Sequence, residues 1–215
     1  MKKFTQEEKL TRIAVDSNII IRMATVDENL FLEPDKQVWF IEQLRIMKRK
    51  CINGSLQIVI TPTVMNELSR NMKKNELEFI QKYCLVVQPE NKEQFAYNTV
   101  KLAVEYMKNG VIPRTGCSND ALIAAEAALC GLNLVTANVH HLVFYEEGEV
   151  SPDHKTLRNE DIQTINERSG LVFWGRSGEK FVPMPCTPDY YVEHFKEGTF
   201  SPIDYGVGVN YERYN

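Results

Sequence analysis

Long apolar runs, signal sequences and internal repeats are missing from this sequence of 215 residues. A helix that spans a membrane needs about 18 or more consecutive apolar residues, and no such run appears. The start, MKKFTQEEKLTR, is polar and mixed in charge, where a secretory signal would have a continuous apolar block. The sequence therefore predicts a cytoplasmic protein with no membrane association.

Cysteine is scarce, and its spacing excludes the usual zinc sites. The five cysteines are an odd number, and none of them forms a CxxC pair of the kind that tetrahedral zinc sites use. Most lie in apolar stretches, which predicts reduced residues of the core. They are Cys51, Cys84, Cys117, Cys130 and Cys186.

The net charge of −4 argues against a broadly basic nucleic-acid binder, but the charge is uneven. Residues 1–145 hold 18 Lys/Arg against 16 Asp/Glu, a net of +2, whereas residues 146–215 hold 7 against 13, a net of −6. The first part is thus the one expected to face an anion. Its basic residues gather in RIMKRK (Arg45, Lys48, Arg49, Lys50) and RNMKK (Arg70, Lys73, Lys74). Both clusters fit either phosphate contact or a solvated helix face.

Strand and helix patterns alternate along the first two-thirds of the chain. RIAV and LQIVI are typical of strands, and the segment between them, DKQVWFIEQLRIMKRKCI, has helical spacing that ends at Asn53-Gly54. The later patterns are a helix from Pro62 through TVMNELSRNM, a strand CLVVQP, a helix closed by Gly110, an alanine-rich helix SNDALIAAEAALC before Gly131, and a strand LNLVTA. This order predicts an α/β domain with a parallel central sheet and helices on both faces.

The character of the chain changes after residue 145. An acidic connection, EEGEVSPDH, leads to a predicted helix in TLRNEDIQTINERSG and a predicted strand in LVFW. From residue 175 onward we expect an ordered but irregular tail, because its many aromatic rings are too large to leave in water. The sequence therefore divides into a domain of residues 1–145 and an extension of residues 146–215 packed on it.

An aspartate ends the first strand pattern, in RIAVDSNIII. A carboxylate at the edge of a core needs hydrogen-bond donors or a cation, and ligands of parallel sheets bind at the carboxyl ends of the strands. We expect two acids of later helices to meet Asp16 there: Glu67, about one and a half turns into its helix, and Asp120, in the first turn of its helix. Three such carboxylates repel one another unless a divalent cation neutralises them, and oxygen ligands suit Mg²⁺ or Mn²⁺. Ser17 and Asn18 are expected to donate to Asp16 or to cap the next turn.

Each acid taken alone also has an ordinary structural explanation. A single aspartate at a strand end is commonly a turn former or a helix cap. Asp120 alone would be an acid that the helix dipole favours in a first turn, with Ser118 or Asn119 as the cap. Glu67 alone would be a residue of a helix surface. Their occurrence at successive strand–helix junctions is what favours a shared site.

The ordered set of VDSNII, TPTVMNEL and SNDALIAAEAALCGLNLVTANV resembles the PIN-domain ribonucleases, which include the toxins of VapBC toxin–antitoxin pairs. The resemblance covers residues 12–145 and places Asp16, Glu67 and Asp120 at the first three acidic positions of the family. It implies a three-layer α/β/α fold with about five parallel strands. It also implies an acidic pocket that binds Mg²⁺ or Mn²⁺ and hydrolyses phosphodiester bonds of single-stranded RNA.

The fourth acidic position of the family is not matched. In TANVHHLVF, Asn138 and His141 stand at the two places where members of the family have an aspartate. Asn138 is expected to contact a metal-bound water or to position the cation, and His141 to hold a phosphate or act as an acid. The alternative is that His140 and His141 are polar residues beginning a short helix. Other candidates for the missing charge are Glu146, Glu147 and Asp161.

The functional prediction is therefore a metal-dependent endoribonuclease with Asp16, Glu67, Asp120 and Asn138 at its centre. Residues expected to contact the RNA are Ser17, Asn18, His141, Lys48, Arg49, Arg70 and Lys73. The resemblance also implies two candidate protein partners, a small antitoxin-like protein and a second copy of the chain in a homodimer.

Two other functions remain as alternatives. The first is a PIN fold that binds RNA or a protein and cuts nothing, because the fourth acid is missing. The second is a metal-dependent phosphatase of the haloacid dehalogenase type, with Asp16 as nucleophile. That chemistry normally requires a second aspartate two residues later, where this sequence has Asn18.

Overall fold

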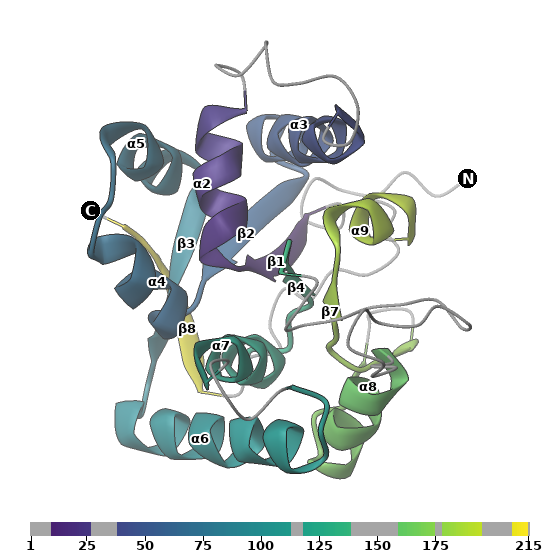
Figure 1. Ribbon diagram of the computed structural model, residues 1–215. Coiled ribbons are helices and arrows are strands. Elements are labelled where there is room, and N and C mark those ends of the chain that lie inside the picture. Colours follow the sequence, from purple (N-terminus) through teal and green to yellow (C-terminus); the bar gives the residue numbers. More distant parts are fainter. Residues whose placement is uncertain are drawn as a thin grey trace.

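The computed structural model describes residues 10–26, 38–112, 118–138, 159–174, 178–194 and 208–214. These residues form an α/β structure around one six-stranded, mostly parallel sheet (Figure 1). Its strands are β1 (Thr11–Val15), β2 (Leu56–Ile60), β3 (Cys84–Pro89), β4 (Leu134–Val135), β7 (Pro185–Cys186) and β8 (Val209–Arg213). A separate two-stranded sheet pairs β5 (Phe173–Trp174) with β6 (Lys180–Phe181).

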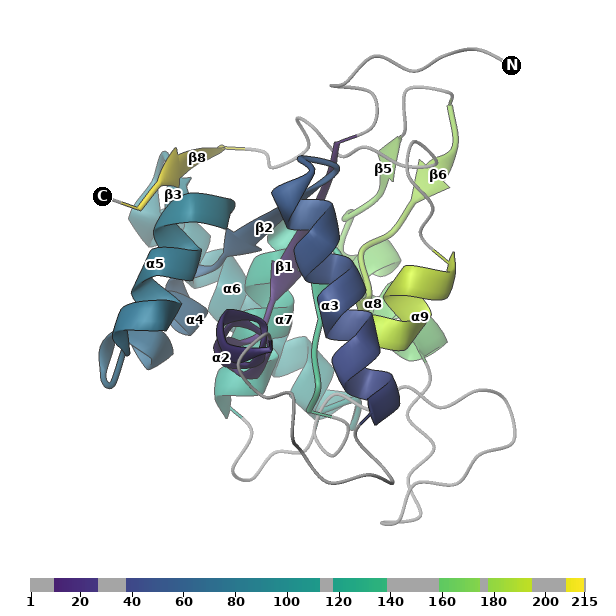
Figure 2. The same ribbon diagram turned by 90° about the horizontal axis from the view of Figure 1, so that it is seen from above.

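Helices cover both faces of the sheet, as the alternating pattern predicts (Figures 1 and 2). The helices are α2 (Ser17–Thr25), α3 (Val38–Ile52), α4 (Pro62–Ser69), α5 (Lys74–Tyr83), α6 (Lys92–Lys108), α7 (Ser118–Leu129), α8 (Asn159–Arg168) and α9 (Pro188–His194). One face carries α2, α3, α5 and α9, and the other carries α6, α7 and α8. The arrangement is compatible with a three-layer α/β/α fold.

The first strand of the chain ends where its aspartate begins a helix. The segment RIAVDSNIII has apolar residues on both sides of its aspartate, yet β1 stops at Val15 and α2 starts at Ser17. The break arises because Asp16 is the N-cap of α2, and its Oδ1 accepts a hydrogen bond from the backbone N–H of Ile19 at 2.9 Å. Ile19 and Ile20 are therefore buried on a helix instead of continuing the strand.

The strand order is β7-β4-β1-β2-β3-β8, and each of the first five is parallel to its neighbour. From β1 the chain moves outward in one direction through β2 and β3. It then returns by α6 and α7 to place β4 on the opposite side of β1. The order thus reverses at β1, and ligands of open α/β sheets bind in the crevice at the carboxyl ends of the strands on either side of such a point.

One expectation about a single element was wrong. The helix expected to run from Pro62 through Met72 instead ends at Ser69, and a second helix, α5, starts at Lys74. The backbone N–H of Lys73 donates to Glu76 Oε2 at 2.9 Å, a capping contact that begins the new helix. The strand expected in LVFW is confirmed at Phe173–Trp174, where it pairs with β6 in a separate sheet.

The expectation of an irregular tail was also wrong for its described parts. β7 pairs in parallel with β4, and β8 pairs antiparallel with β3, so residues beyond 145 supply both edges of the sheet. The edge strands of the first two-thirds of the chain, β4 and β3, would otherwise present unpaired backbone groups. Tyr211 of β8 also fixes this segment, because its hydroxyl donates to the Cys130 carbonyl at 3.3 Å and its ring lies under Arg12.

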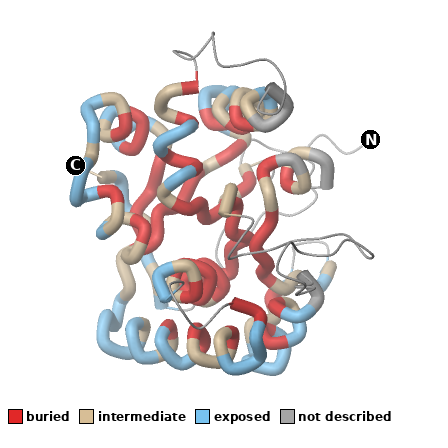
Figure 3. The backbone as a smooth tube through the Cα atoms, viewed as in Figure 1, coloured by how far each residue is buried: buried red, intermediate tan, exposed pale blue. Residues whose placement is uncertain are grey.

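The core lies between the layers, where buried residues of the strands meet the inner faces of the helices (Figure 3). Cys51, Cys84, Cys130 and Cys186 are free and buried within it, which confirms the prediction for these four. Cys117 lies outside the described residues. Among the helices that the structure describes, none is long and apolar enough to cross a membrane.

Candidate functional site

Asp16 lies at the carboxyl end of β1, in the position that the sequence predicts. Its side chain is buried, with 5% of the residue exposed. Besides the contact with the Ile19 N–H, its second oxygen, Oδ2, accepts a hydrogen bond from the Thr136 hydroxyl. Thr136 directly follows β4, so this hydrogen bond joins the ends of the two strands that flank the reversal of strand order.

Burial raises the pKa of the Asp16 carboxyl above its ordinary value. The hydrogen bonds from Thr136 and from the backbone lower the pKa and oppose this effect. The neighbouring Asp120 carboxylate raises the pKa again, which shows that the two acids lie close enough to interact. Burial therefore makes the ionised form of Asp16 unfavourable, and a nearby cation would stabilise it.

Asp120 and Asn138 meet at the same edge. Asp120 lies in the first turn of α7, as predicted, and Asn138 follows the end of β4. The side-chain amide of Asn138 donates to Asp120 Oδ1 at 3.1 Å, and its backbone N–H donates to Thr136 Oγ1 at 3.0 Å. Asn138 thus stands beside Asp120 and offers it an amide donor.

Glu67 is held by two donors from two other elements. Ser17 Oγ donates to Glu67 Oε2 at 2.8 Å, and Asn119 Nδ2 donates to Glu67 Oε1 at 2.9 Å. Ser17 follows Asp16 in the chain, and Asn119 precedes Asp120. The expectation that Ser17 and Asn119 serve as a donor to Asp16 and as a helix cap was therefore incomplete: their side chains bind the carboxylate of α4.

These hydrogen bonds and the peptide links close into one ring at the carboxyl edge of the sheet. Its members are Asp16, Ser17, Glu67, Asn119, Asp120, Asn138 and Thr136. The ring joins the β1–α2 junction, the helix α4, the start of α7 and the residues after β4, so all three predicted acids belong to a single network. Within the described residues, no three acidic, histidine or cysteine side chains lie close enough to hold a metal ion among themselves.

A fourth acid, Glu126, adjoins this network, and the sequence analysis did not identify it. It is 5% exposed, and burial raises its pKa, as does the Glu67 carboxylate. In the sequence, a charged residue of a helix is ordinarily assigned to the helix surface, and Glu126 carries no motif that sets it apart. The one signal in the sequence is that a carboxylate amid small apolar residues must find a partner when the helix is buried.

The remaining predicted residues are spread over several elements. Asn18 is exposed on α2, and Asp161 is exposed on α8, which packs against α6 and β7. Arg70 and Lys73 are exposed just after α4 and just before α5. His140, His141, Glu146 and Glu147 lie outside the described residues.

The basic cluster of α3 is partly engaged in ion pairs. Arg49 pairs with Glu42 at 2.7 Å, and Arg45 approaches the same carboxylate at 3.7 Å. Both are exposed pairs of the kind that contributes little to stability. Together with Lys48 and Ile52, these side chains line a shallow hollow of about 310 Å³. The prediction of RNA contact by Lys48 and Arg49 stays a prediction.

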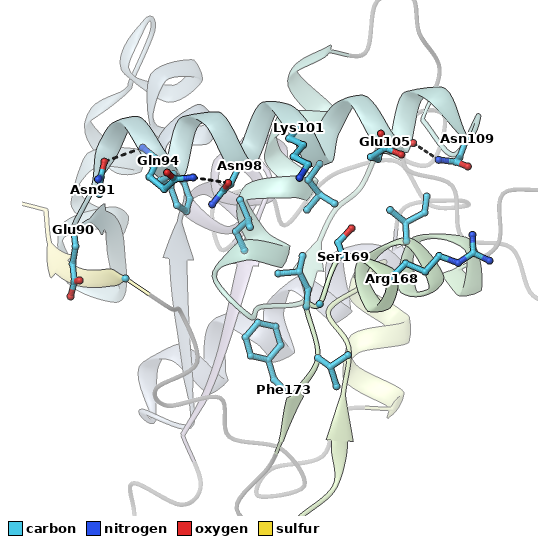
Figure 4. A pocket seen from close by; sticks show the side chains of 18 residues that line it. Glu90, Asn91, Gln94, Asn98, Lys101, Glu105, Asn109, Arg168, Ser169 and Phe173 are labelled. Carbon is cyan, nitrogen blue, oxygen red and sulfur yellow. Dashed lines mark hydrogen bonds between the residues drawn. The ribbon is translucent and has the colours of Figure 1, made fainter.

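A larger cavity, of about 860 Å³, lies along one face of α6 (Figure 4). Amide side chains of α6, among them Gln94 and Asn98, face the segment between α8 and β5, where Arg168 and Phe173 lie. Asp16, Glu67 and Asp120 do not line this cavity. The carboxylate network and this cavity are therefore separate features.

Thr136 is the side chain on which the network depends most directly, since it donates to Asp16 and accepts from the Asn138 N–H. We expect Thr136→Val to lower the free energy of unfolding by about 1–3 kcal/mol, because it leaves buried polar groups unpaired. Thr136→Ser keeps the hydroxyl and should lower the free energy of unfolding much less. Thermal unfolding followed by circular dichroism measures the difference, and equal melting temperatures for the two variants would contradict it.

Comparison of the chain with protein-family models, with curated proteins and with solved structures finds no match in any of the three.

Proposed function

We propose that this protein is a metal-dependent endoribonuclease of the PIN type, which hydrolyses phosphodiester bonds of single-stranded RNA. The observation that carries the proposal is the ring of hydrogen bonds that joins Asp16, Glu67 and Asp120 at the point where the strand order reverses. Carboxylates from the end of β1, from α4 and from the start of α7 come together at one edge of the sheet, where they repel one another unless a cation neutralises them. A shared cation at the carboxyl edge of the sheet accounts for this arrangement.

The chemistry of the donors fits Mg²⁺ or Mn²⁺. The side chains at this edge offer carboxylate and amide oxygens, which these hard cations prefer. Mg²⁺ keeps several of its waters and is commonly bound through one or two carboxylates, so it does not require three acids in contact with one another. Asp16 and Asp120 would hold the cation, with Glu67 acting directly or through a water.

When bound, the cation neutralises charge on a phosphate and lowers the pKa of a water molecule. The protein's own contribution is the fixed placement of charge. Thr136 and the Ile19 N–H orient the Asp16 carboxylate, and Ser17 and Asn119 orient that of Glu67. In the hydrolysis, the oxygen of a water forms a bond to phosphorus, the bond from phosphorus to the leaving ribose oxygen breaks, and that oxygen gains a proton.

The residue two positions after Asp16 gives the phosphatase alternative little support. That chemistry normally requires a second aspartate there. This chain has Asn18, which is exposed on α2. A PIN-type protein that binds RNA without cutting it remains the alternative, because Asn138 replaces a charged ligand.

The decisive experiment is incubation of the purified protein with mixed single-stranded and double-stranded RNAs, with Mn²⁺, with Mg²⁺ or with EDTA. We expect cleavage of single-stranded RNA that requires the cation and is absent from Asp120→Asn. RNA binding without cleavage in every condition would favour the binding module. Cleavage that persists in EDTA would contradict a metal-dependent mechanism.

A further inference from the structure

Glu126 is a buried carboxylate in the middle of α7, among alanines that pack into the core. Five of its neighbours on the helix are buried alanines: Ala121, Ala124, Ala125, Ala127 and Ala128. Among the described residues, no lysine or arginine forms an ion pair with it. A buried carboxylate destabilises the fold unless it accepts hydrogen bonds. The donors that contact Glu126 therefore indicate its role.

Both oxygens of Glu126 accept hydrogen bonds from Thr63 of α4. The backbone N–H of Thr63 donates to Oε2 at 3.0 Å, and the Thr63 hydroxyl donates to Oε1 at 2.8 Å. Thr63 is the second residue of α4, so its N–H is one of those that lack a partner within the helix. Thr61, the N-cap, makes no capping hydrogen bond through its side chain. Glu126 therefore caps α4 from another helix, at the end where the dipole favours an anion.

The contact with Thr63 lies one helical turn from the proposed cation site. Thr63 and Glu67 are four residues apart on α4, which places them on the same face of that helix. Asn119 and Glu126 are seven residues apart on α7 and also share a face. The two helices are thus joined by two contacts, Glu67 with Asn119 and Thr63 with Glu126.

We propose that Glu126 is a positioning residue of the cation site, because it fixes the start of α4 on α7 and thereby sets Glu67 relative to Asp120. This inference rests on the proposed function. Glu126 itself touches neither the cation nor the RNA. Its effect on both is exerted through the placement of the Glu67 carboxylate.

The test compares Glu126→Ala with Glu126→Gln in the full chain. Alanine removes the contact with Thr63, and we expect the affinity for Mn²⁺ and kcat to fall by about 10–100-fold, the usual effect of losing a group that orients a ligand. KM for RNA should stay the same. Glutamine should restore most of the loss, because its oxygen can accept from the Thr63 N–H while its amide donates to the Thr63 hydroxyl. Calorimetric Mn²⁺ titration well below the melting temperature measures affinity without reference to activity.

Two further comparisons separate positioning from a general loss of stability. In a Glu67→Ala background, the additional change Glu126→Ala should have no further effect on Mn²⁺ affinity, because residues that act through one another are not additive. Glu76→Ala is the matched control: Glu76 is also a buried carboxylate that caps a helix, on α5, and its loss should lower stability without changing Mn²⁺ affinity. Should Glu126→Ala not fold, Thr63→Val against Thr63→Ser tests the same contact.

Each outcome decides between the proposals. A wild-type protein that neither binds Mn²⁺ nor cleaves RNA overturns the proposed function, and this inference with it. A wild-type protein that does both, with Glu126→Ala unchanged, overturns the inference alone. An additive loss in the Glu67→Ala background also overturns it, because Glu126 would then act independently of Glu67.

Discussion

Asp16→Asn abolishes the proposed nuclease activity, with an expected loss of about 100-fold or more, and leaves the fold intact. A bound divalent cation in such a role supplies several kcal/mol of stabilisation, and each 1.4 kcal/mol is a factor of ten in rate. Asparagine is as good an N-cap as aspartate, so its oxygen can still accept from the Ile19 N–H. Initial rates of RNA cleavage at saturating Mn²⁺ measure the loss. Equal rates in the two proteins would show that Asp16 is not part of the site.

The same substitution is expected to raise stability when no divalent cation is present. Burial and the Asp120 carboxylate raise the pKa of Asp16, so the folded state binds its proton more tightly than the unfolded state does. The stability of the wild type therefore falls as the pH rises from the ordinary aspartate pKa, near 4, through the raised value, and the cost of the buried charge is fully present above it. Asp16→Asn has no such dependence.

At neutral pH in EDTA we thus expect Asp16→Asn to melt about 2–4 °C higher than the wild type, the shift that about 1 kcal/mol produces in a chain of this size. Saturating Mg²⁺ should stabilise the wild type and reduce or reverse the difference. Ser17→Ala serves as the control, since it removes a hydrogen bond to Glu67 and leaves the Asp16 charge in place. A lower melting temperature for Asp16→Asn in EDTA would contradict the argument from charge crowding.

Asn138→Asp is expected to strengthen Mg²⁺ binding by about tenfold or more and to raise activity with it. The change adds a negative charge beside Asp120, and two unit charges about 4 Å apart interact by about 4 kcal/mol near a protein surface. Only part of that energy is gained, because the new carboxylate also loses the hydrogen bond that the Asn138 amide donates to Asp120 Oδ1. Calorimetric titration of the two proteins with Mg²⁺ measures the gain.

The cost of the extra charge gives a second readout. Without a cation, Asn138→Asp should lower the melting temperature, since a donor is replaced by a carboxylate next to Asp120. Asn98→Asp on α6, which adds the same charge away from the network, is the control and should change neither the affinity nor its dependence on the cation. If the affinity of Asn138→Asp is unchanged or weaker, the fourth charge comes from elsewhere or the edge is not a cation site.

Local patterns in the sequence were sufficient for most of the parallel sheet. β1, β2 and β3 follow alternations and β-rich runs that are visible in a few residues, and α3, α6 and α7 each end near a glycine. The positions of Asp16, Glu67 and Asp120 at strand–helix junctions follow from the same patterns. The helix that starts at Ser17 was not identified, because the apolar residues of SNIII suit either a strand or a helix and the cap at Asp16 decides between them.

The two edges of the sheet could not be predicted in this way. β7 has two residues and β8 lies in a segment without clear periodicity, so neither carries a signal of its own. Each becomes a strand because a longer neighbour, β4 or β3, offers backbone groups to pair with. The hydrogen-bond partners of the site residues could not be predicted either, since Ser17 is 50 positions from Glu67 and Thr136 is 120 positions from Asp16.

The sequence by itself determined the strands β1 to β4, the helices α3, α6 and α7 between them, and the acids beside their ends, because these depend on neighbours a few residues apart. Only the tertiary structure decided that Ser17 and Asn119 hold Glu67, that Asn138 donates to Asp120, and that Glu126 caps α4. Those contacts join residues from different elements. They form only when the packing of helices on the sheet brings the elements within hydrogen-bond distance, which no local pattern encodes.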